Sequence, residues 1–336
     1  MASDGQVEPH GGKSEKEPVA THLAWPERVK AAHQHLVSRG HVDPIVAVST
    51  PGGRHHCGDI DARCEIGSIT KVFTSLLLAE LVRTGEVRLD DKVANLVPEG
   101  TRLARGVDLI SLEHLACHRS GLPRLPPGVM AKSMSRNALA DPYAEIDDSR
   151  LLASLAQTRV RGTPGQAPVR YSNFGVGLLG MLLGRVTGLG YEQTLRARVI
   201  DPLGMAATSF DDTPLHQGHH RGKPVSPWHM AALAGAGGVR APAEDLLVFL
   251  EAVRDGGGPL DAAIAETVKP RTDQGRLRVG LGWFLLGDGD VLMHDGGTLG
   301  ARSEVRLERH SGTAVVVLGD DRRGTARAAA MLLNPR

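Results

Sequence analysis

The order of strand-like and helix-like segments along the chain is the feature that most constrains its fold. One strand-like run, residues 44–50, lies near the start, and others at 279–286, 291–294, 303–308 and 313–318 lie near the end. The late runs are rich in β-branched residues and are separated by glycine-containing turns, which is typical of antiparallel hairpins. Helical stretches broken by Pro and Gly turns fill the middle. This order favours a single sheet built from both ends of the chain.

We therefore predict an α/β fold, in which an antiparallel sheet is flanked by N- and C-terminal helices and carries an inserted all-helical domain. The sheet domain is expected over residues 21–75 and 236–336. The mainly helical domain is expected over residues 76–235, with the active site at the interface of the two. Residues 1–20 have the composition of a disordered tail.

Composition excludes several classes of function. The sequence has 39 Lys and Arg residues against 38 Asp and Glu, so it offers no general attraction to nucleic acid or to an anionic membrane. Aromatic residues make up 3% of the chain, too few to suggest stacking platforms for nucleic acid. No apolar run is long enough to span a bilayer. The expected partner is a small molecule, and the sequence leaves the oligomeric state open.

Cysteine usage bears on the compartment. Cys57, Cys64 and Cys117 are odd in number and form no Cys-x-x-Cys pair, so neither a disulfide framework nor a zinc ribbon is indicated. We interpret them as reduced structural thiols of a cytosolic protein. The N-terminal residues lack the apolar segment of a secretory signal peptide, which also leads us to expect a cytoplasmic location.

The clearest helix in the sequence begins at Gly67-Ser68 and ends at Gly85. Ser68 and Lys71 are three residues apart on it, so their side chains stand on one face with Cβ atoms about 5–6 Å apart. A serine hydroxyl needs a base before it becomes a good nucleophile. Apolar flanking residues would bury Lys71 and lower its pKa, which makes the neutral amine accessible. The alternative is a capping Ser with a solvated Lys.

Tyr171-Ser172-Asn173 stands at a second loop–helix junction. With positive groups nearby, the pKa of Tyr171 is expected to fall, so that a phenolate or a Tyr–Lys pair acts as general base. Asn173 can hold Lys71 or a substrate amide. The alternative is that the Tyr packs and the Asn caps the helix.

His294-Asp295-Gly296-Gly297 follows a predicted strand. Glycines at this place would let a substrate approach the strand backbone closely. The backbone N–H groups of Gly297 and Ser68 could then form an oxyanion hole. The alternative is a glycine hairpin with an exposed His.

Other histidines are weaker candidates. His216, His219 and His220 share a short loop whose Gly and Pro neighbours suggest flexibility, without the supporting hydrogen bonds that metal ligands usually have. His114 and His118 lie at helical spacing and are expected to pack or cap. We expect neither a metal nor a cofactor.

The ordered set of Ser-x-x-Lys, Tyr-x-Asn and His-x-Gly resembles the class C β-lactamase-like serine hydrolases. That group includes β-lactamases, penicillin-binding D,D-carboxypeptidases, family VIII esterases and acyltransferases. The similarity covers about residues 25–335 and extends to further segments: residues 64–74, 89–93, 114–123, 201–205 and 234–238.

The resemblance implies a role for each motif residue. Ser68 would be the nucleophile, and Lys71 and Tyr171 its base partners. Asn173 would contact the substrate or Lys71. His294 and Gly296 would form the third motif, and the N–H groups of Ser68 and Gly297 the oxyanion hole.

His294 departs from the β-lactamase pattern, in which a Lys usually stands there. An unperturbed His is mostly neutral at pH 7, so the field that attracts a substrate carboxylate is weaker. His-x-Gly is similar to esterase and acyltransferase members. We therefore expect an intracellular esterase or transacylase that forms acyl-Ser68 from an ester or amide and passes it to water, an amine or an alcohol, with a natural-product pathway as one setting. The alternatives are a β-lactamase or D,D-carboxypeptidase, and a non-catalytic ligand-binding homologue.

Overall fold

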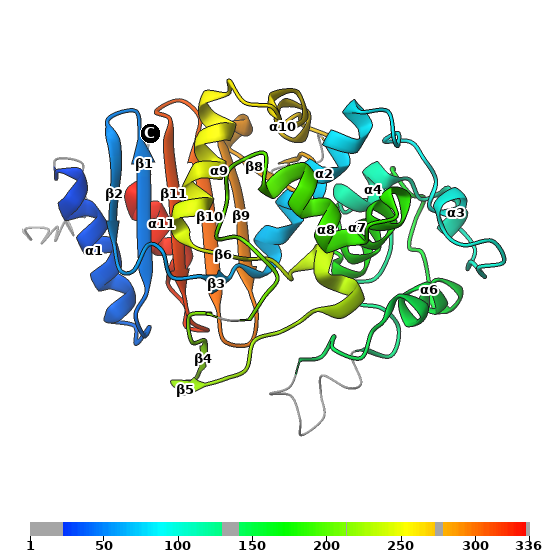
Figure 1. The fold of residues 1–336 in the computed structure, drawn as a ribbon, viewed down its shortest axis with the longest axis horizontal. Coiled ribbons are helices and arrows are strands. Elements are labelled where there is room, and N and C mark those ends of the chain that lie inside the picture. The colour runs from blue at the N-terminus through cyan, green and yellow to red at the C-terminus, as the bar shows by residue number, and fades with distance from the viewer. Residues whose placement is uncertain (1–22, 130–140, 213, 273–277, 334–336) are drawn as a thin grey trace, which may run out of the picture.

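The computed structural model describes residues 23–129, 141–212, 214–272 and 278–333, so the predicted tail at 1–20 lies outside the described residues. Its helices are α1 (Trp25–Val37), α2 (Thr70–Arg83), α3 (Val93–Leu96), α4 (Leu112–Ala116), α6 (Asp148–Gln157), α7 (Asn173–Thr187), α8 (Tyr191–Leu195), α9 (Ala243–Asp255), α10 (Asp261–Thr267) and α11 (Thr325–Leu332) (Figure 1). Short helical turns are η1 (Gly67–Ile69), η2 (Val107–Leu109), η3 (Arg196–Ile200), η4 (Ala231–Ala236) and η5 (Gly287–Gly289).

The strands form one large sheet and two small pairs. The large sheet is antiparallel and has the order β2-β1-β11-β10-β9-β8-β7. Its members are β1 (Ile45–Thr50), β2 (Gly53–Cys57), β7 (Arg278–Val279), β8 (Phe284–Leu286), β9 (Val291–Gly297), β10 (Arg302–Glu308) and β11 (Thr313–Gly319). The pairs are β3 (Cys64–Glu65) with β6 (Arg240–Ala241), and β4 (His219–His220) with β5 (Lys223–Pro224). The predicted α/β fold with a sheet made from both ends of the chain is confirmed.

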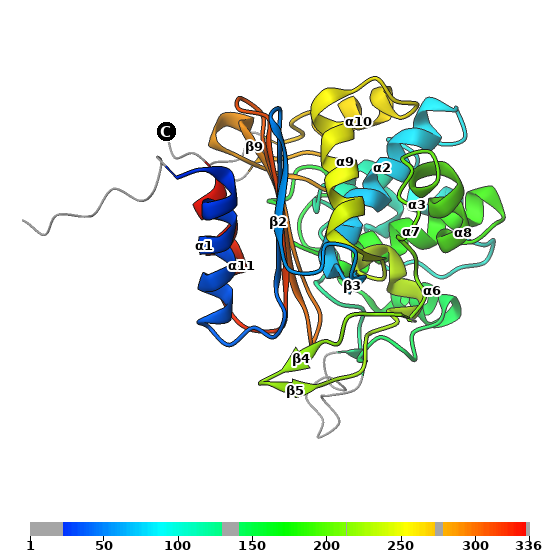
Figure 2. The ribbon, with the colours of Figure 1, turned by 60° about the vertical axis from the view of Figure 1, so that its left-hand side comes forward.

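One face of the sheet is covered by the two terminal helices. Strand β1 is buried along its whole length, and its Val46 and Val48 pair with Val317 and Val315 of β11. These valines point toward α1 and α11, which lie together on that face (Figure 2). Each such side chain contributes about 1.5–3 kcal/mol when it leaves water, so this small core holds both ends of the chain together.

The opposite face packs on α2 and α9. Every residue of α2 from Thr70 to Leu81 is buried. The Phe73 ring lies 4.6 Å from that of Phe249 on α9, which stacks on Trp283 at 5.9 Å between ring centroids. The helix that follows Ser68 is therefore a rigid part of the main core, which fixes the position of its first turn.

Glycines let α7 approach its neighbours closely. A Cβ atom at Gly180 would lie 2.9 Å from the Gly235 Cα atom of η4, and Gly177 and Gly184 are equally crowded by Leu233 and Tyr191. Side chains at these positions would push η4 and α8 away. This packing fixes the start of α7, where Tyr171 and Asn173 lie, relative to the Ala236 carbonyl at the end of η4.

Several local predictions need correction. The strand expected over residues 279–286 is two short strands, because the turn between them at Gly282 has φ +75° and passes against the Lys71 carbonyl. The second strand expected from Arg54 to Cys64 ends at Cys57. The stretch expected to be mainly helical, residues 76–235, also holds the short β4–β5 hairpin, and residue 75, the expected boundary, lies within α2.

Within the described ranges, no single helix is long and apolar enough to cross a membrane. One pair of helices, Asn173–Thr187 and Tyr191–Ile200, which are bent by 80° relative to each other, together has the length and composition of a membrane span.

Candidate active site

Ser68 and Lys71 meet at the first turn of the buried helix. Gly67 enters this turn with φ +49°, and Ser68 follows in η1 with its side chain partly exposed. Lys71 lies one turn further on, completely buried, and its Nζ donates to Ser68 Oγ at 2.9 Å and to the Ala236 carbonyl at 2.5 Å. The predicted contact between hydroxyl and amine is present, and the alternative of a solvated Lys is wrong.

Burial lowers the pKa of Lys71 well below its ordinary value. The positive charge of Arg124 lowers this pKa further, while the carboxylate of Asp295 opposes the shift. A buried ammonium loses hydration that one neutral hydroxyl and one carbonyl replace only partly. The neutral amine is therefore accessible near neutral pH, with its nitrogen beside the Ser68 hydroxyl.

Tyr171 lies against the same two side chains. Lys71 Nζ is 4.8 Å from the centroid of the Tyr171 ring, and the phenol hydrogen-bonds the Ser68 side chain. Burial raises the pKa of Tyr171 well above its ordinary value, because desolvation outweighs both the Ser68 hydrogen bond and the Arg124 charge. The expected fall in this pKa is wrong. Tyr171 is a neutral phenol here, suited to passing a proton rather than to acting as a phenolate.

Asn173 lies beside this cluster, but its hydrogen bond goes elsewhere. Its Nδ2 donates to the Tyr143 hydroxyl at 3.4 Å, while Lys71 Nζ donates to Ser68 and Ala236. The cap of α7 is Ser172, whose Oγ accepts from the Gly175 N–H at 2.9 Å. Asn173 Oδ1 is buried and has no hydrogen-bond partner within the described part of the chain. It can accept a hydrogen bond from a substrate amide.

His294 lies on β9 and is completely buried, so the alternative of an exposed His is wrong. Burial and the nearby Lys71 charge lower the pKa of His294 to about 4. Its Nδ1 lies 2.7 Å from the backbone carbonyl of Asp295, which assigns the ring proton to Nδ1. Its ring centroid is 6.4 Å from that of Tyr171. The third motif thus supplies a neutral imidazole to the site.

The backbone beside the nucleophile lies directly against the end of β9. A Cβ atom at Gly67 would lie 2.6 Å from the Gly297 nitrogen, and one at Gly296 would collide with the Ile66 carbonyl. Only glycines allow so close an approach. The structure therefore packs Gly67, the residue before the nucleophile, against Gly297, while the oxyanion hole formed by the Ser68 and Gly297 N–H groups stays a prediction.

His118 is a site residue that sequence reasoning missed. It lies beyond the end of α4, with φ +57°, and its ring centroid is 4.6 Å from that of Tyr171. Its Nδ1 accepts from the Ser172 N–H at 3.2 Å, and burial keeps its pKa well below the ordinary value. Of the two histidines expected to pack or cap, His114 caps α4 with Ser111. The signal that could have identified His118 as a site residue was its place in the family-like segment 114–123.

Glu65 is a second residue that was missed. This buried carboxylate accepts from the Trp228 N–H at 2.8 Å and from the Thr298 hydroxyl at 3.1 Å. Burial raises the pKa of Glu65, and the two donors oppose the rise. Thr298 directly follows Gly297, so Glu65 ties the segment before Ser68 to the segment after the third motif. Its only signal in the sequence was its place in the family-like segment 64–74.

The remaining candidates take no part in this cluster. His219 faces Asp320 at 3.7 Å and His220 faces Asp321 at 2.7 Å. The described residues contain no group of three or more His, Cys, Asp or Glu side chains that could hold a metal ion. The three cysteines are free thiols, and burial raises the pKa of both Cys64 and Cys117 to about 12, which makes them unreactive.

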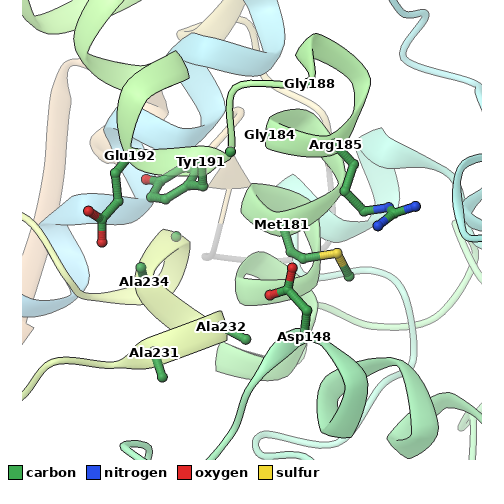
Figure 3. Close-up of a pocket in the computed structure, with 12 residues that line it drawn as sticks. Asp148, Met181, Gly184, Arg185, Gly188, Tyr191, Glu192, Ala231, Ala232 and Ala234 are labelled. Carbon is green, nitrogen blue, oxygen red and sulfur yellow. The ribbon is translucent and has the colours of Figure 1, made fainter.

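A separate cavity of about 450 Å³ lies between α7, α8 and η4 (Figure 3). Tyr191, Ala234 and Gly235 form part of its wall, and Asp148, Arg185 and Glu192 line it as well. The Tyr191 hydroxyl lies 2.7 Å from Thr74 Oγ1, one turn along α2 from Lys71. None of the predicted site residues lines this cavity.

Comparison with known proteins gives a consistent result. The family model described as β-lactamase matches residues 40–334. The chain is 29% identical over 199 residues to the D-alanyl-D-alanine-carboxypeptidase/endopeptidase AmpH of Escherichia coli K12, which is 57% of this chain and 49% of that protein. It is 28% identical over 259 residues to the esterase EstB of Burkholderia gladioli, which is 66% of this chain and 65% of that protein. The match to AmpH thus spans about half of that relative's length.

A solved class C β-lactamase superposes with a TM-score of 0.79 at 19% identity, covering 92% of this chain and 96% of the other. At this identity the likeness establishes the fold alone.

Proposed function

Since the chain belongs to the β-lactamase family of serine hydrolases, we propose that it forms an acyl-enzyme on Ser68 from a carboxylic ester or amide. The observation that carries this proposal is the contact of the fully buried Lys71 amine with Ser68 Oγ at 2.9 Å. A desolvated amine with a lowered pKa is the kind of base that a serine nucleophile needs.

In the first half-reaction, the neutral Lys71 amine takes the hydroxyl proton as Ser68 Oγ bonds to the acyl carbon. The carbonyl oxygen becomes an oxyanion, and the N–H groups of Ser68 and Gly297 stabilise it. One such donor is worth about 10²–10³ in rate. The Tyr171 phenol gives its proton to the leaving oxygen or nitrogen as the bond to the acyl carbon breaks, and regains a proton from Lys71.

In the second half-reaction, water, an alcohol or an amine attacks the acyl carbon of acyl-Ser68. Its proton passes to the Lys71–Tyr171 pair, and Ser68 leaves with a proton from the same pair. Both halves thus use the same three side chains in opposite directions.

We propose an esterase or transacylase within this reaction class. The support is His294, which is neutral because its pKa is about 4, where β-lactamases of the class resembled usually carry a charged Lys. The similarity to EstB agrees with this preference. We further propose a cytoplasmic location, which the three free thiols support.

A second candidate is a D,D-carboxypeptidase or β-lactamase, which the likeness to AmpH favours. One rate panel separates the candidates. It compares 4-nitrophenyl butyrate, a chromogenic cephalosporin and a D-Ala-D-Ala peptide, each with and without an added amine. Faster ester consumption with amine, together with an amide product, establishes acyl transfer. Preferential turnover of the peptide or the cephalosporin establishes the second candidate instead.

The nucleophile is tested by intact mass after treatment with a fluorophosphonate. We expect one adduct on the wild type and none on Ser68→Ala, whose turnover should fall by about 10⁶. Ser75→Ala is the matched control, because Ser75 lies buried on the same helix and its Oγ has no hydrogen-bond partner among the described residues. A wild type without an adduct would favour a non-catalytic binding protein.

A further inference from the structure

Arg124 stands at the candidate active site without a role in the mechanism above. Its side chain is exposed, and its guanidinium carbon lies 5.1 Å from the centroid of the Tyr171 ring. None of the ion pairs among the described residues includes Arg124, whose recorded side-chain contact is with the Tyr171 ring. The guanidinium is therefore a permanent positive charge beside the group that hydrogen-bonds Ser68.

The backbone around Arg124 is fixed to the start of α7. The Arg124 carbonyl accepts from the Phe174 N–H at 3.1 Å, and the neighbouring Pro123 carbonyl accepts from Ser172 Oγ at 2.7 Å. These two hydrogen bonds hold the base of the side chain next to the Tyr171-Ser172-Asn173 motif. A long side chain on a fixed base covers a limited region, here the region over Tyr171.

The charge of Arg124 reaches the reacting groups. It lowers the pKa of Lys71 and of His118, and it opposes the rise in the pKa of Tyr171. These neighbours do not neutralise it, since they are a fully buried amine, a buried imidazole and a phenol. With respect to the residues that the structure describes, this positive charge thus remains able to pair with a ligand.

Other charges nearby do not take its place. His294 is neutral at pH 7. Asp295 is the next residue on β9 and stands opposite Glu304; its carboxylate raises the pKa of Lys71 and of Tyr171, and its negative charge cannot bind an anion. Arg302 is held in place through its Nη1, which donates to the carbonyls of Thr298 and Ala301 at 2.8 and 3.0 Å.

We propose that Arg124 binds a carboxylate carried by the acyl donor, so that the enzyme selects anionic esters or amides. The proposal rests on the acyl-enzyme function proposed above. A guanidinium presents two parallel N–H groups that match a carboxylate, and it stays charged at every working pH. An Arg over an aromatic ring keeps this edge free, because the ring contacts the flat face.

The test uses three esters: neutral 4-nitrophenyl butyrate, mono-4-nitrophenyl glutarate with a carboxylate on the acyl part, and 3-carboxy-4-nitrophenyl butyrate with a carboxylate on the leaving group. For each enzyme, kcat/KM of an anionic ester is divided by that of the neutral ester. Comparison of this ratio between variants cancels the intrinsic reactivity of the esters.

In Arg124→Gln the ratio should fall about 10–100-fold for at least one anionic ester, the range expected for loss of a charge-assisted hydrogen bond. Arg124→Lys should keep part of the preference for anionic esters, because it retains the positive charge but lacks the two parallel N–H groups of a guanidinium. Added salt should weaken the wild-type preference. The matched control is Arg185→Gln, which removes an exposed Arg at the far end of α7 and should keep the wild-type ratio.

A second readout excludes a merely structural role. Removal of the Arg124 charge should move the acidic limb of the kcat/KM profile for the neutral ester, where activity rises as Lys71 loses its proton, to higher pH, because Arg124 lowers the pKa of Lys71. Arg124→Lys should leave this limb near its wild-type position.

Two failures are distinguishable. A ratio that is equal in the wild type and Arg124→Gln for both anionic esters, with fluorophosphonate labelling of Ser68 intact, overturns the assignment of Arg124 alone. A wild type that takes no label and consumes none of the esters overturns the proposed function, and this assignment with it.

Discussion

A methyl group built on Gly67 would lie 2.6 Å from the backbone nitrogen of Gly297. The same glycine has φ +49°, a left-handed conformation that costs an L-residue about 1–2 kcal/mol. Two restrictions therefore act at Gly67, one on its backbone angle and one on the space between it and β9.

Gly67→Ala should move β9 away from Ser68 and slow fluorophosphonate labelling by about 10²–10³, the effect of losing one oxyanion donor. Gly85→Ala is the control, since Gly85 has φ +80° and nothing within 4 Å of its Cβ position. It should lose stability through backbone strain alone. Equal labelling rates for Gly67→Ala and the wild type would contradict the close packing described here.

Lys71→Met should abolish labelling and should change how stability depends on pH. The folded-state pKa of Lys71 is lowered, so between that pKa and its ordinary value of 10.5 the unfolded chain binds more protons than the folded one. Stability of the wild type is therefore lost as pH falls through this window. The difference in Tm between Lys71→Met and the wild type should shift in favour of the mutant from pH 10 to pH 7. A pH-independent difference would show that Lys71 is charged in the folded protein.

His294 should make the protein sensitive to mild acid. The pKa of His294 is lowered from 6.5 to about 4, so between these values the unfolded chain binds more protons than the folded one. The free energy of unfolding should therefore decrease by roughly 3 kcal/mol as pH falls from 6.5 toward 4. Urea unfolding at pH 7 and pH 4.5 should show a smaller loss for His294→Gln than for the wild type. His118 also has a lowered pKa and remains in both proteins, so the comparison isolates His294. Equal losses of stability in the two proteins would rule out a lowered pKa for His294.

Glu65 and Thr298 should be energetically coupled. Their hydrogen bond is buried and 3.1 Å long, so Glu65→Gln and Thr298→Val should each cost about 1–3 kcal/mol, with the double variant costing less than the sum by at least 0.5 kcal/mol. The exposed pair Thr84 and Glu86, joined at 2.8 Å, is the control and should show coupling below that of the buried pair. Additive effects at Glu65 and Thr298 would mean that this hydrogen bond does not stabilise the contact between the segment before Ser68 and the end of β9.

Local patterns were sufficient to predict much of the fold. Apolar spacing between Ser68 and Gly85 predicts α2, and the valine-rich runs predict β1 and β11, because these elements bury regular sets of apolar side chains. The strand expected over 279–286 is broken at Gly282, where the chain must pass the Lys71 carbonyl. That contact joins distant segments, and no local pattern reports it.

The site was predictable where its residues are close together in the sequence. Three residues of spacing place Lys71 beside Ser68, and burial in an apolar helix lowers its pKa as expected. The pKa of Tyr171 was predicted in the wrong direction, since its sign depends on whether burial or the nearby positive charge is larger. Glu65, His118 and Arg124 went unrecognised because their partners lie in other segments.

The position of β1 between β2 and β11 has a consequence for biosynthesis. Val48 is synthesised long before its cross-strand neighbour Val315, because the helical middle of the chain lies between them. The strand must therefore wait, with one edge unpaired and its valines without α11 to cover them, while the residues between β1 and β11 are translated. Chaperones that shield apolar segments are expected to engage the nascent chain during that interval, and the rate of synthesis, more than local helix formation, should set when the enzyme first becomes active.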